Sequence, residues 1–388
     1  MNHSQPQLIR TEQGPEASRK AGVEVLRLGT HYVLHNQIGG AVVLANPYAA
    51  QLWEELEGGA VTDRAVQALA GSWGIDREAT HQQIQSILDD WQSAGLFSAD
   101  RASPRAPPAG GISIAWASSK TYQVGDARVC LRCDDGVVGD VLQRVLHTLE
   151  CDDLTTETVS VCIADGAYWV SSRASHQGPY DFAVARHLAL RDVICVGSAP
   201  EETSAVLHAG AVRVDDRAIL IAGDSGFGKS TLIAGLVLSG CPYIADDLIG
   251  LNRREAKVRS FPVALSLKPG SYDTLKQLIA AKQDLTLAGP DDFGLHYLDA
   301  TVRASEVSET AVSKLVFPNF QAACQRLQIR PVSPLEALQM LLATGTRVAG
   351  ERPTMAPLVK LLNETPAVEL TYSDWREAAA HLTQGRPS

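Results

Sequence analysis

The spacing of hydrophobic positions changes part of the way through residues 22–97. Three short runs come first, VEVLRL, HYVLHN and GAVVLAN, and the glycines between them are typical of turns between small strands. After Asn46-Pro47 the apolar residues recur at helical spacing, in PYAAQLWEELEGG and in two further segments that begin near Thr62 and Asp76. The pattern predicts three strands followed by three helices, in a small winged-helix-like α+β domain.

The pattern then breaks and resumes with a different alternation. Residues 99–111, ADRASPRAPPAGG, have no periodicity and are rich in Pro, Ala and Gly, which predicts a semi-stiff linker. Residues 112–205 alternate strand-like runs (GISIAWA, ARVCLRC, TVSVCIAD, AYWVSS) with helical ones (GDVLQRVLHTL, PYDFAVARHLALRDVI). This alternation predicts α/β structure that extends the sheet of the segment after it, so that residues 112–388 form one α/β domain.

A phosphate-binding loop follows the next buried strand. The run AILIA leads directly into GDSGFGKST, which matches G-x-x-x-x-G-K-[ST] at Gly223, Gly228, Lys229 and Ser230. Glycines let backbone N–H groups point at phosphate oxygens, the lysine neutralises the β- and γ-phosphates, and the serine hydroxyl can ligate Mg²⁺. ATP and Mg²⁺ are therefore the expected cofactors. The predicted nucleotide contacts are Gly223, Asp224, Ser225, Gly226, Phe227, Gly228, Lys229, Ser230 and Thr231.

Two acids end the strand that comes after the loop and its helix. The run CPYIADD is predicted as a second buried strand, parallel to the first and beside it, which would bring Asp246 and Asp247 to the phosphates. One carboxylate could then act as general base, and the other could face Mg²⁺ or a structural donor. Upstream, VLHAGAVRVDD places His208 on the strand expected to pair with the one that feeds the loop. The alternatives are solvated acids in a turn and a histidine satisfied within the core. We predict Asp246, His208, Lys229 and Asp247 as catalytic residues, and Ser230 with Asp247 as metal ligands.

His208, the loop and Asp246, in this spacing, resemble the catalytic core of HPr kinase/phosphorylase. The resemblance implies a phosphoenolpyruvate-carboxykinase-like P-loop fold with a mixed sheet, a seryl hydroxyl as phosphate acceptor, and Asp246 as general base beside His208. It continues less specifically through FPVALSLKPGSY, and Lys268 and Arg303 are candidate contacts to phosphate or acceptor. Thr231 stands where the regulatory enzymes usually have Glu, and the segment associated with their phosphorylase reaction is missing. These departures point to the HPr-kinase-like enzymes that modify ribosomally made peptides, including lasso-peptide kinases.

The first domain also resembles a known family. The order of its elements, with LANPYAAQLWEELEGG and the closing DDWQSAGLF, is similar to PqqD-like peptide-recognition domains. The resemblance implies that the leader of a ribosomally made precursor peptide adds as a strand beside the small sheet and against the third helix, by β-augmentation. The alternative is a helical accessory or dimerisation domain.

Composition limits the classes of binding partner and the cellular compartment expected for the protein. The net charge of −10, without a cluster of Lys or Arg, argues against nucleic acid as a partner. No apolar run approaches the roughly 20 residues that span a bilayer, and the N-terminus is too polar for a signal peptide. Seven cysteines, an odd number, fit reduced thiols better than a disulfide framework. We therefore expect a cytoplasmic protein without a membrane partner.

Together these features predict an ATP- and Mg²⁺-dependent kinase that phosphorylates a Ser or Thr hydroxyl of a precursor peptide, while the first domain holds the leader. A homo-oligomer is compatible with the sequence. Three alternatives stay open: a regulatory HPr-type protein serine kinase, a nucleotide-binding module that delivers peptide without transferring phosphate, and a kinase of a free small molecule.

Overall fold

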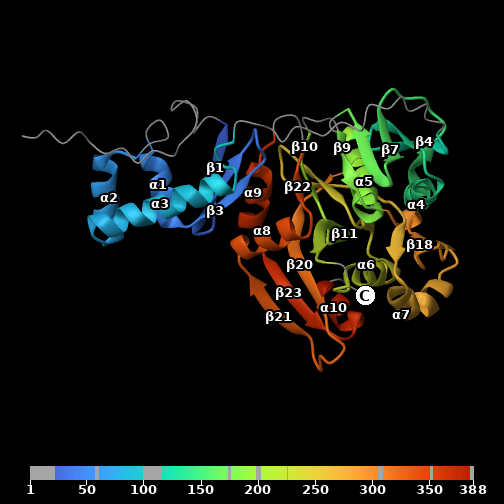
Figure 1. Cartoon of the computed structure of the whole chain (residues 1–388). Coiled ribbons are helices and arrows are strands. Elements are labelled where there is room, and N and C mark those ends of the chain that lie inside the picture. The colour runs from blue at the N-terminus through green and yellow to red at the C-terminus, as the bar shows by residue number, and fades with distance from the viewer. Residues whose placement is uncertain are drawn as a thin grey trace, which may run out of the picture. The chain divides into compact units, whose positions relative to one another are not determined.

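The computed structural model of the chain has two compact units (Figure 1). One, the N-terminal unit, consists of Met1–Ser103 with Pro353–Val359, and the other, the large unit, of Pro104–Arg352 with Lys360–Ser388. The predicted linker over residues 99–111 lies outside the described part of the chain. The described residues are 22–56, 61–98, 116–173, 176–197, 202–224, 226–304, 309–349 and 353–384.

The N-terminal unit contains the predicted three strands followed by three helices. The strands form an antiparallel sheet in the order β1-β2-β3. Each helix follows a capping residue, because the side chains of Asn46, Thr62 and Asp76 each accept a hydrogen bond from the backbone N–H three residues on. The elements are β1 (Val23–Leu28), β2 (His31–Asn36), β3 (Val42–Ala45), α1 (Pro47–Glu55), α2 (Asp63–Trp73) and α3 (Arg77–Ser93).

One buried side chain ties the sheet of this unit to the end of α3. Asn36, 2% exposed, closes β2, and its amide group donates to the backbone oxygens of Leu96 at 3.0 Å and Ser98 at 2.8 Å. Its side-chain oxygen accepts from the backbone N–H groups of Ile38 and Gly39, both at 2.9 Å. A single side chain therefore satisfies the backbone of the turn after β2 and of the chain that leaves α3.

The phosphate loop belongs to a mixed six-stranded sheet in the large unit, in the order β13-β11-β12-β20-β23-β21. β12 runs parallel to β20, and β20 runs parallel to β23, whereas β11 is antiparallel to both β12 and β13. The strands are β11 (Ala209–Val214), β12 (Arg217–Ala222), β13 (Tyr243–Ala245), β20 (Val312–Phe320), β21 (Gln328–Val332) and β23 (Ala367–Tyr372). Helix α6 (Lys229–Leu238) packs on α7 (Pro269–Ala280) and α10 (Trp375–Leu382).

The segment before the loop forms its own sheet, so the prediction that it extends the phosphate-loop sheet is wrong. Its six strands lie in the order β6-β4-β5-β7-β8-β9, and α5 packs against this sheet. Most of the predicted strand GISIAWA, residues 111–115, lies outside the described part, and the next strand, β4, begins at Ser118. β4, SSKTYQV, escaped recognition because polar residues make up most of it. The elements are β4 (Ser118–Val124), β5 (Ala127–Cys133), α4 (Gly136–Leu146), η2 (His147–Leu149), β6 (Glu150–Cys151), β7 (Thr158–Ala164), β8 (Ala167–Ser172), β9 (His176–Tyr180) and α5 (Phe182–Gly197).

Two smaller sheets complete the large unit, in the orders β19-β15-β14-β10-β22 and β16-β18-β17. The unit is thus mixed α/β with several sheets, as its alternating sequence predicts. The remaining elements of the chain are β10 (Thr203–Leu207), β14 (Ile249–Asn252), β15 (Val258–Arg259), β16 (Leu265–Leu267), β17 (Thr286–Ala288), β18 (His296–Asp299), η3 (Thr301–Arg303), β19 (Glu309–Thr310), α8 (Pro334–Ala343), β22 (Arg347–Val348) and α9 (Ala356–Glu364).

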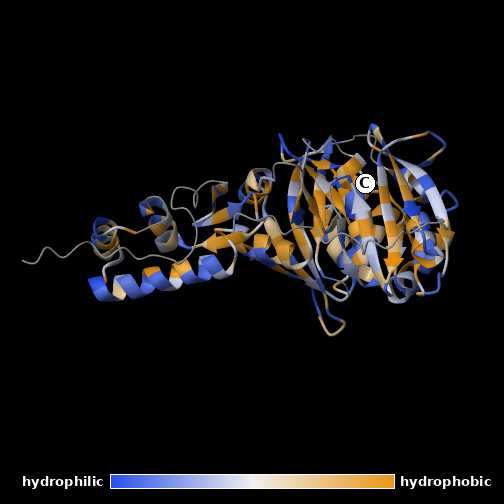
Figure 2. Cartoon of the chain, turned by 45° about the horizontal axis from the view of Figure 1, so that its top comes forward, coloured by the Kyte–Doolittle hydropathy of each residue, from blue (hydrophilic) through white to orange (hydrophobic). Residues whose placement is uncertain are grey.

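The apolar interior of the large unit surrounds the helix that follows the loop. Apolar residues concentrate along the strands of this unit in Figure 2. Seven consecutive residues of α6, Leu232–Leu238, are buried, because the helix lies between the sheet and its two neighbouring helices. No helix within the described ranges is both long and apolar enough to cross a bilayer.

We predict that Asn36→Ala destabilises the N-terminal unit by about 2–4 kcal/mol, because it leaves several buried backbone groups without partners. Hydrogen–deuterium exchange of the full-length chain measures this as lost protection of the β2 amides. Gln83→Ala, which removes an exposed amide side chain from α3, is the control and should change protection little. Equal protection in the two variants would contradict the role of Asn36.

Candidate functional site

The phosphate loop joins β12 to α6 at the carboxyl end of the strand. Gly226 and Gly228 have φ angles of 96° and 94°, left-handed values that residues with side chains rarely adopt. A glycine-rich curl of this kind can turn backbone N–H groups toward one side, the arrangement that holds phosphate oxygens. α6 begins at Lys229, directly after the loop, and its N-terminus adds a positive dipole. The local structure therefore suits an anion.

The other residues predicted to contact the nucleotide lie in the loop and in the first turn of α6. The Phe227 N–H donates to the Asp224 carbonyl at 3.4 Å, which closes the loop on itself. Ser230 is half-buried in the first turn of α6, whereas the Thr231 hydroxyl donates to Ser271 on α7 at 2.7 Å. Thr231 thus ties α6 to α7 through its side chain. The predicted contact at Ser225 lies outside the described residues.

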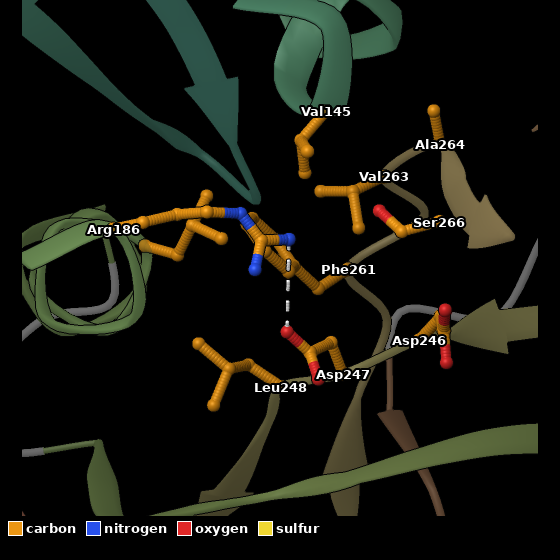
Figure 3. A pocket seen from close by; sticks show the side chains of 10 residues that line it. Val145, Arg186, Asp246, Asp247, Leu248, Phe261, Val263, Ala264 and Ser266 are labelled. Atoms are coloured by element: carbon orange, nitrogen blue, oxygen red, sulfur yellow. Dashed lines mark ion pairs between the residues drawn. The ribbon is translucent and has the colours of Figure 1, made fainter. Parts of the chain in front are cut away.

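The two acids sit in a tight turn after β13. The Leu248 N–H donates to the Asp246 carbonyl at 2.8 Å, and Asp247 between them has a φ of 68°. A three-residue turn with a positive φ at a non-glycine residue is strained, at a cost of about 1–3 kcal/mol. The turn sends the two carboxylates to different places: Asp247 faces Arg186, while Asp246 lies on the side of Ser266 (Figure 3).

The direction of β13 was predicted correctly, but its position was not. β13 points the same way as β12, yet β11 lies between them and is antiparallel to both. The sequence of a three-residue strand does not specify its neighbour. His208 directly precedes β11 rather than lying within it. Because β11 is antiparallel to β12, this junction reaches the same edge of the sheet as the loop.

Asp247 gathers three cationic or potentially cationic side chains. Its Oδ1 lies 2.9 Å from His208 Nε2 and 3.3 Å from Lys229 Nζ, and its Oδ2 lies 4.0 Å from an Nη atom of Arg186. Burial by itself raises the pKa of Asp247, but Lys229, the hydrogen bond with His208 and the charge of Arg186 outweigh it and hold the pKa well below its usual range. Asp247 is consequently an anion at neutral pH.

His208 is positioned through both of its ring nitrogens. Nδ1 lies 2.5 Å from the carbonyl oxygen of Thr344, and Nε2 faces the Asp247 carboxylate. Both partners are acceptors, so this geometry is satisfied when both nitrogens donate, as they do in the imidazolium. The ring centre of the neighbouring His187 lies 5.3 Å away; burial and the nearby cations lower the pKa of His187 to about 4, and it is neutral at pH 7.

Asp246 has the opposite character to Asp247. It is 2% exposed, and within the described chain its Oδ1 has no hydrogen-bond partner. Burial, and to a smaller extent the charge of Asp247, raises its pKa to about 6, while Lys229 opposes the rise. The carboxylate lines a cavity of about 10 Å³ together with Arg186 and Ser266, enough for about one water molecule. Asp246 can therefore take up a proton near neutral pH.

Among the described residues, no three His, Cys, Asp or Glu side chains are grouped as a protein-only metal site. Mg²⁺ does not require such a group, since it usually takes one or two protein oxygens and completes its shell with phosphate and water. The Ser230 hydroxyl and the carboxylates of the turn are hard oxygen donors, and the orphaned Oδ1 of Asp246 is one of them. The donor set present therefore fits Mg²⁺ with a triphosphate.

The two basic residues predicted to contact phosphate or acceptor, Lys268 and Arg303, lie in different places. Lys268 is exposed at the N-cap of α7, two residues after Ser266 of the cavity, and its phosphate contact stays a prediction. Arg303 donates to Asp284 at 2.7 Å and to the backbone oxygen of Val237 at 3.2 Å. Val237 lies at the C-terminal end of α6, the end opposite the loop. The structure therefore does not bring Arg303 to the phosphate loop.

Sequence reasoning missed Arg186 and His187. Both come from α5, which packs against the separate sheet: Arg186 reaches Asp247 and lines the cavity beside Asp246, and the His187 ring lies against that of His208. The Arg186 side chain is 19% exposed, and its Nε is buried without a partner in the described chain. The helical run PYDFAVARHLALRDVI carries no local signal for this placement, which depends on how two sheets pack.

Comparisons with known proteins agree with part of this picture. Residues 31–96 match the family model described as coenzyme PQQ synthesis protein D (PqqD), which confirms the PqqD-like interpretation of the N-terminal domain. Among solved structures, the HPr(Ser) kinase/phosphatase from Coxiella burnetii matches with 13% identity and a TM-score of 0.24, over 46% of this chain and 86% of that one. Such a low TM-score does not establish a common fold. No curated protein matches the chain in sequence.

We predict graded effects of adding a methyl group at three glycines. At Gly226 the methyl would meet no described atom within 4 Å, so only the left-handed φ matters and the unfolding free energy of the large unit should fall by about 1–2 kcal/mol. At Gly228 the methyl would also lie 2.6 Å from the Tyr372 hydroxyl and 3.2 Å from Phe320 Cβ, so Gly228→Ala should cost more.

Gly270→Ala is the control for these two variants, because Gly270 is in α7 with open space around it and an ordinary φ. It should leave the stability unchanged or slightly raised. Calorimetric unfolding of the full-length chain measures all three. A Gly228 variant as stable as the Gly270 variant would contradict the described loop conformation.

Proposed function

We propose that this protein is an ATP- and Mg²⁺-dependent kinase of a phosphoenolpyruvate-carboxykinase-like P-loop type, which phosphorylates a Ser or Thr hydroxyl of a ribosomally synthesised precursor peptide. The observation that carries the proposal is the pair of adjacent carboxylates with opposite properties beside Lys229: Asp247 as a fixed anion and Asp246 as a buried acceptor of protons. A base beside a fixed anion can take the proton of an attacking hydroxyl group while the phosphates are held next to it.

The acceptor chemistry follows from Asp246. A hydroxyl group in the cavity donates its proton to Asp246, its oxygen forms a bond to the γ-phosphorus, and the bond from that phosphorus to the β,γ-bridging oxygen breaks to release ADP. A base with a pKa of about 6 is mostly deprotonated at neutral pH and still takes up a proton as the hydroxyl becomes acidic during attack.

The cationic side chains around Asp247 support the part of the proposal that concerns binding of the nucleotide phosphates. Lys229 extends from the loop toward Asp247, the place where charge on the transferring group would develop. Arg186, with an unpartnered buried Nε, adds a second fixed cation from α5. Mg²⁺, held by Ser230 and Asp247 with the phosphates, would neutralise the β- and γ-oxygens. These groups supply the electrostatic stabilisation on which phosphoryl transfer mainly depends.

The peptide part of the proposal comes from the N-terminal unit. PqqD-like domains bind the leader of a precursor peptide as an added strand, and here β3 pairs with β2 on one side only within the described sheet. A bound leader raises the effective concentration of an acceptor that the catalytic site recognises weakly. A single chain with both parts therefore suits a substrate whose modified residue lies outside the recognised segment.

The proposal predicts that a precursor peptide encoded next to the gene for this chain gains one or more phosphates when incubated with the full-length protein, ATP and Mg²⁺. Mass spectrometry measures the gain. Removing the leader from the peptide should lower kcat/KM by about 100-fold or more, because the tethering advantage is lost. Leader binding without any phosphate transfer would instead identify a delivery module and overturn the kinase assignment.

We further predict that Asp246→Asn binds ATP normally but transfers phosphate at least about a hundredfold more slowly, the usual size of a general-base effect. In the unmodified protein, kcat/KM for the peptide should rise with pH through about 6, because the raised pKa leaves Asp246 protonated below that value and deprotonated above it. The Asn variant should lose this rise. Asp292→Asn, an exposed acid of the same unit, is the control. Near-normal transfer by the Asp246 variant would place the base elsewhere.

A further inference from the structure

Two phenylalanines at the phosphate loop are exposed to solvent. Phe227, within the loop, is 44% exposed, and Phe320, the last residue of β20, is 46% exposed. Two exposed aromatic side chains near each other, at the carboxyl ends of strands where ligands bind in α/β sheets, are candidates for a ligand contact. Neither is used by the phosphoryl-transfer chemistry proposed above.

The backbone fixes the two residues relative to each other. The Phe320 N–H donates to the Phe227 carbonyl at 3.1 Å, and a methyl group added at Gly228 would lie 3.2 Å from Phe320 Cβ. Behind them, the buried ring of Tyr372 meets the Phe320 ring edge-on, with centres 6.1 Å apart, and its hydroxyl donates to the Gly228 carbonyl at 3.4 Å. The Phe320 ring is thus supported against the loop itself.

The order of strands indicates which way a bound nucleotide would lie across the site. Asp246 and Asp247 follow β13, and His208 precedes β11, so the reacting groups lie on one side of β12. β20 lies on the other side of β12, and Phe320 stands at its carboxyl end. Because Lys229 extends to Asp247, the γ-phosphate of a nucleotide belongs on the acidic side. The other end of the nucleotide, its nucleoside, then extends toward β20.

We propose that Phe320, together with Phe227, forms a platform on which the base of the nucleotide stacks. The inference rests on the proposed function, since it concerns the same bound ATP. An aromatic ring with an exposed face is the natural partner of a planar base, and stacking of this kind contributes about 1–3 kcal/mol per base. The platform therefore contributes affinity for the nucleoside part, while the loop holds the phosphates.

Calorimetric titration of the full-length chain separates these contributions with two probes, each given with Mg²⁺: the non-hydrolysable ATP analogue AMPPNP, and inorganic tripolyphosphate, which has no base. Phe320→Ala should weaken AMPPNP binding by about 5- to 150-fold, the range that corresponds to one lost stack, and leave tripolyphosphate binding unchanged. Phe320→Trp, which retains an aromatic face, should bind AMPPNP within a few-fold of the unmodified protein.

Phe293→Ala is the matched control, because Phe293 is 52% exposed in the same unit but stacks on Phe182 of α5. It should bind both probes normally. The inference is overturned if Phe320→Ala binds AMPPNP normally, if it loses both probes equally, or if it alters only the KM for the acceptor peptide. If the unmodified chain binds neither probe, the proposed function fails as well, and the inference fails with it. If the chain binds tripolyphosphate and AMPPNP equally well, only the platform is refuted.

Discussion

The carboxylate of Asp247 is the point on which the arrangement of the site depends. It lies within reach of Lys229 at the start of α6, His208 before β11 and Arg186 on α5. Four segments that are distant in the chain therefore meet at one anion. A half-buried charge of this kind is costly unless it is paired. The three partners offset that cost, and the Asp247 carboxylate in turn holds them in place.

The position of Asp247 also determines the properties of its neighbour. The tight turn that gives Asp247 a positive φ directs Asp246 into a small cavity, whereas the carboxylate of Asp247 meets the cations directly. Burial then raises the pKa of Asp246 toward neutrality, whereas the cations lower that of Asp247. Two identical side chains, adjacent in sequence, thus acquire separate roles from their surroundings, which is a recurring way for a site to obtain both a fixed charge and a base.

The features that the sequence predicted well are those set by local chemistry. The caps at Asn46, Thr62 and Asp76 and the change of hydrophobic period define the N-terminal unit, because each depends on residues within a few positions. The phosphate loop is recognisable because its motif lies within eight consecutive residues, and the positive φ of Gly228 shows why one motif position requires glycine. The approach of Asp246, Asp247, His208 and Lys229 to one another agrees with their expected grouping, although their roles stay predictions.

The features that were missed depend on how distant parts of the chain pack. Whether β13 adjoins β12 or is separated from it by β11 is decided by the whole sheet, and three residues cannot specify it. Arg186 reaches the site because α5, besides covering its own sheet, packs against β10 and β14 of the five-stranded sheet, which the helical pattern of α5 does not reveal. Arg303 looked suitable by charge alone, but it is engaged with Asp284 and the end of α6.

The central claim is that the two adjacent carboxylates have different protonation behaviour. NMR titration of the full-length chain with ¹³C-labelled aspartate carboxyl groups tests it directly, with Asp246→Asn and Asp247→Asn used to assign the two signals. We predict that the Asp246 signal titrates near pH 6, while the Asp247 signal shows the ionised form down to pH values below the ordinary aspartate pKa. Two signals that titrate together near the ordinary value of about 3.9 would contradict the account.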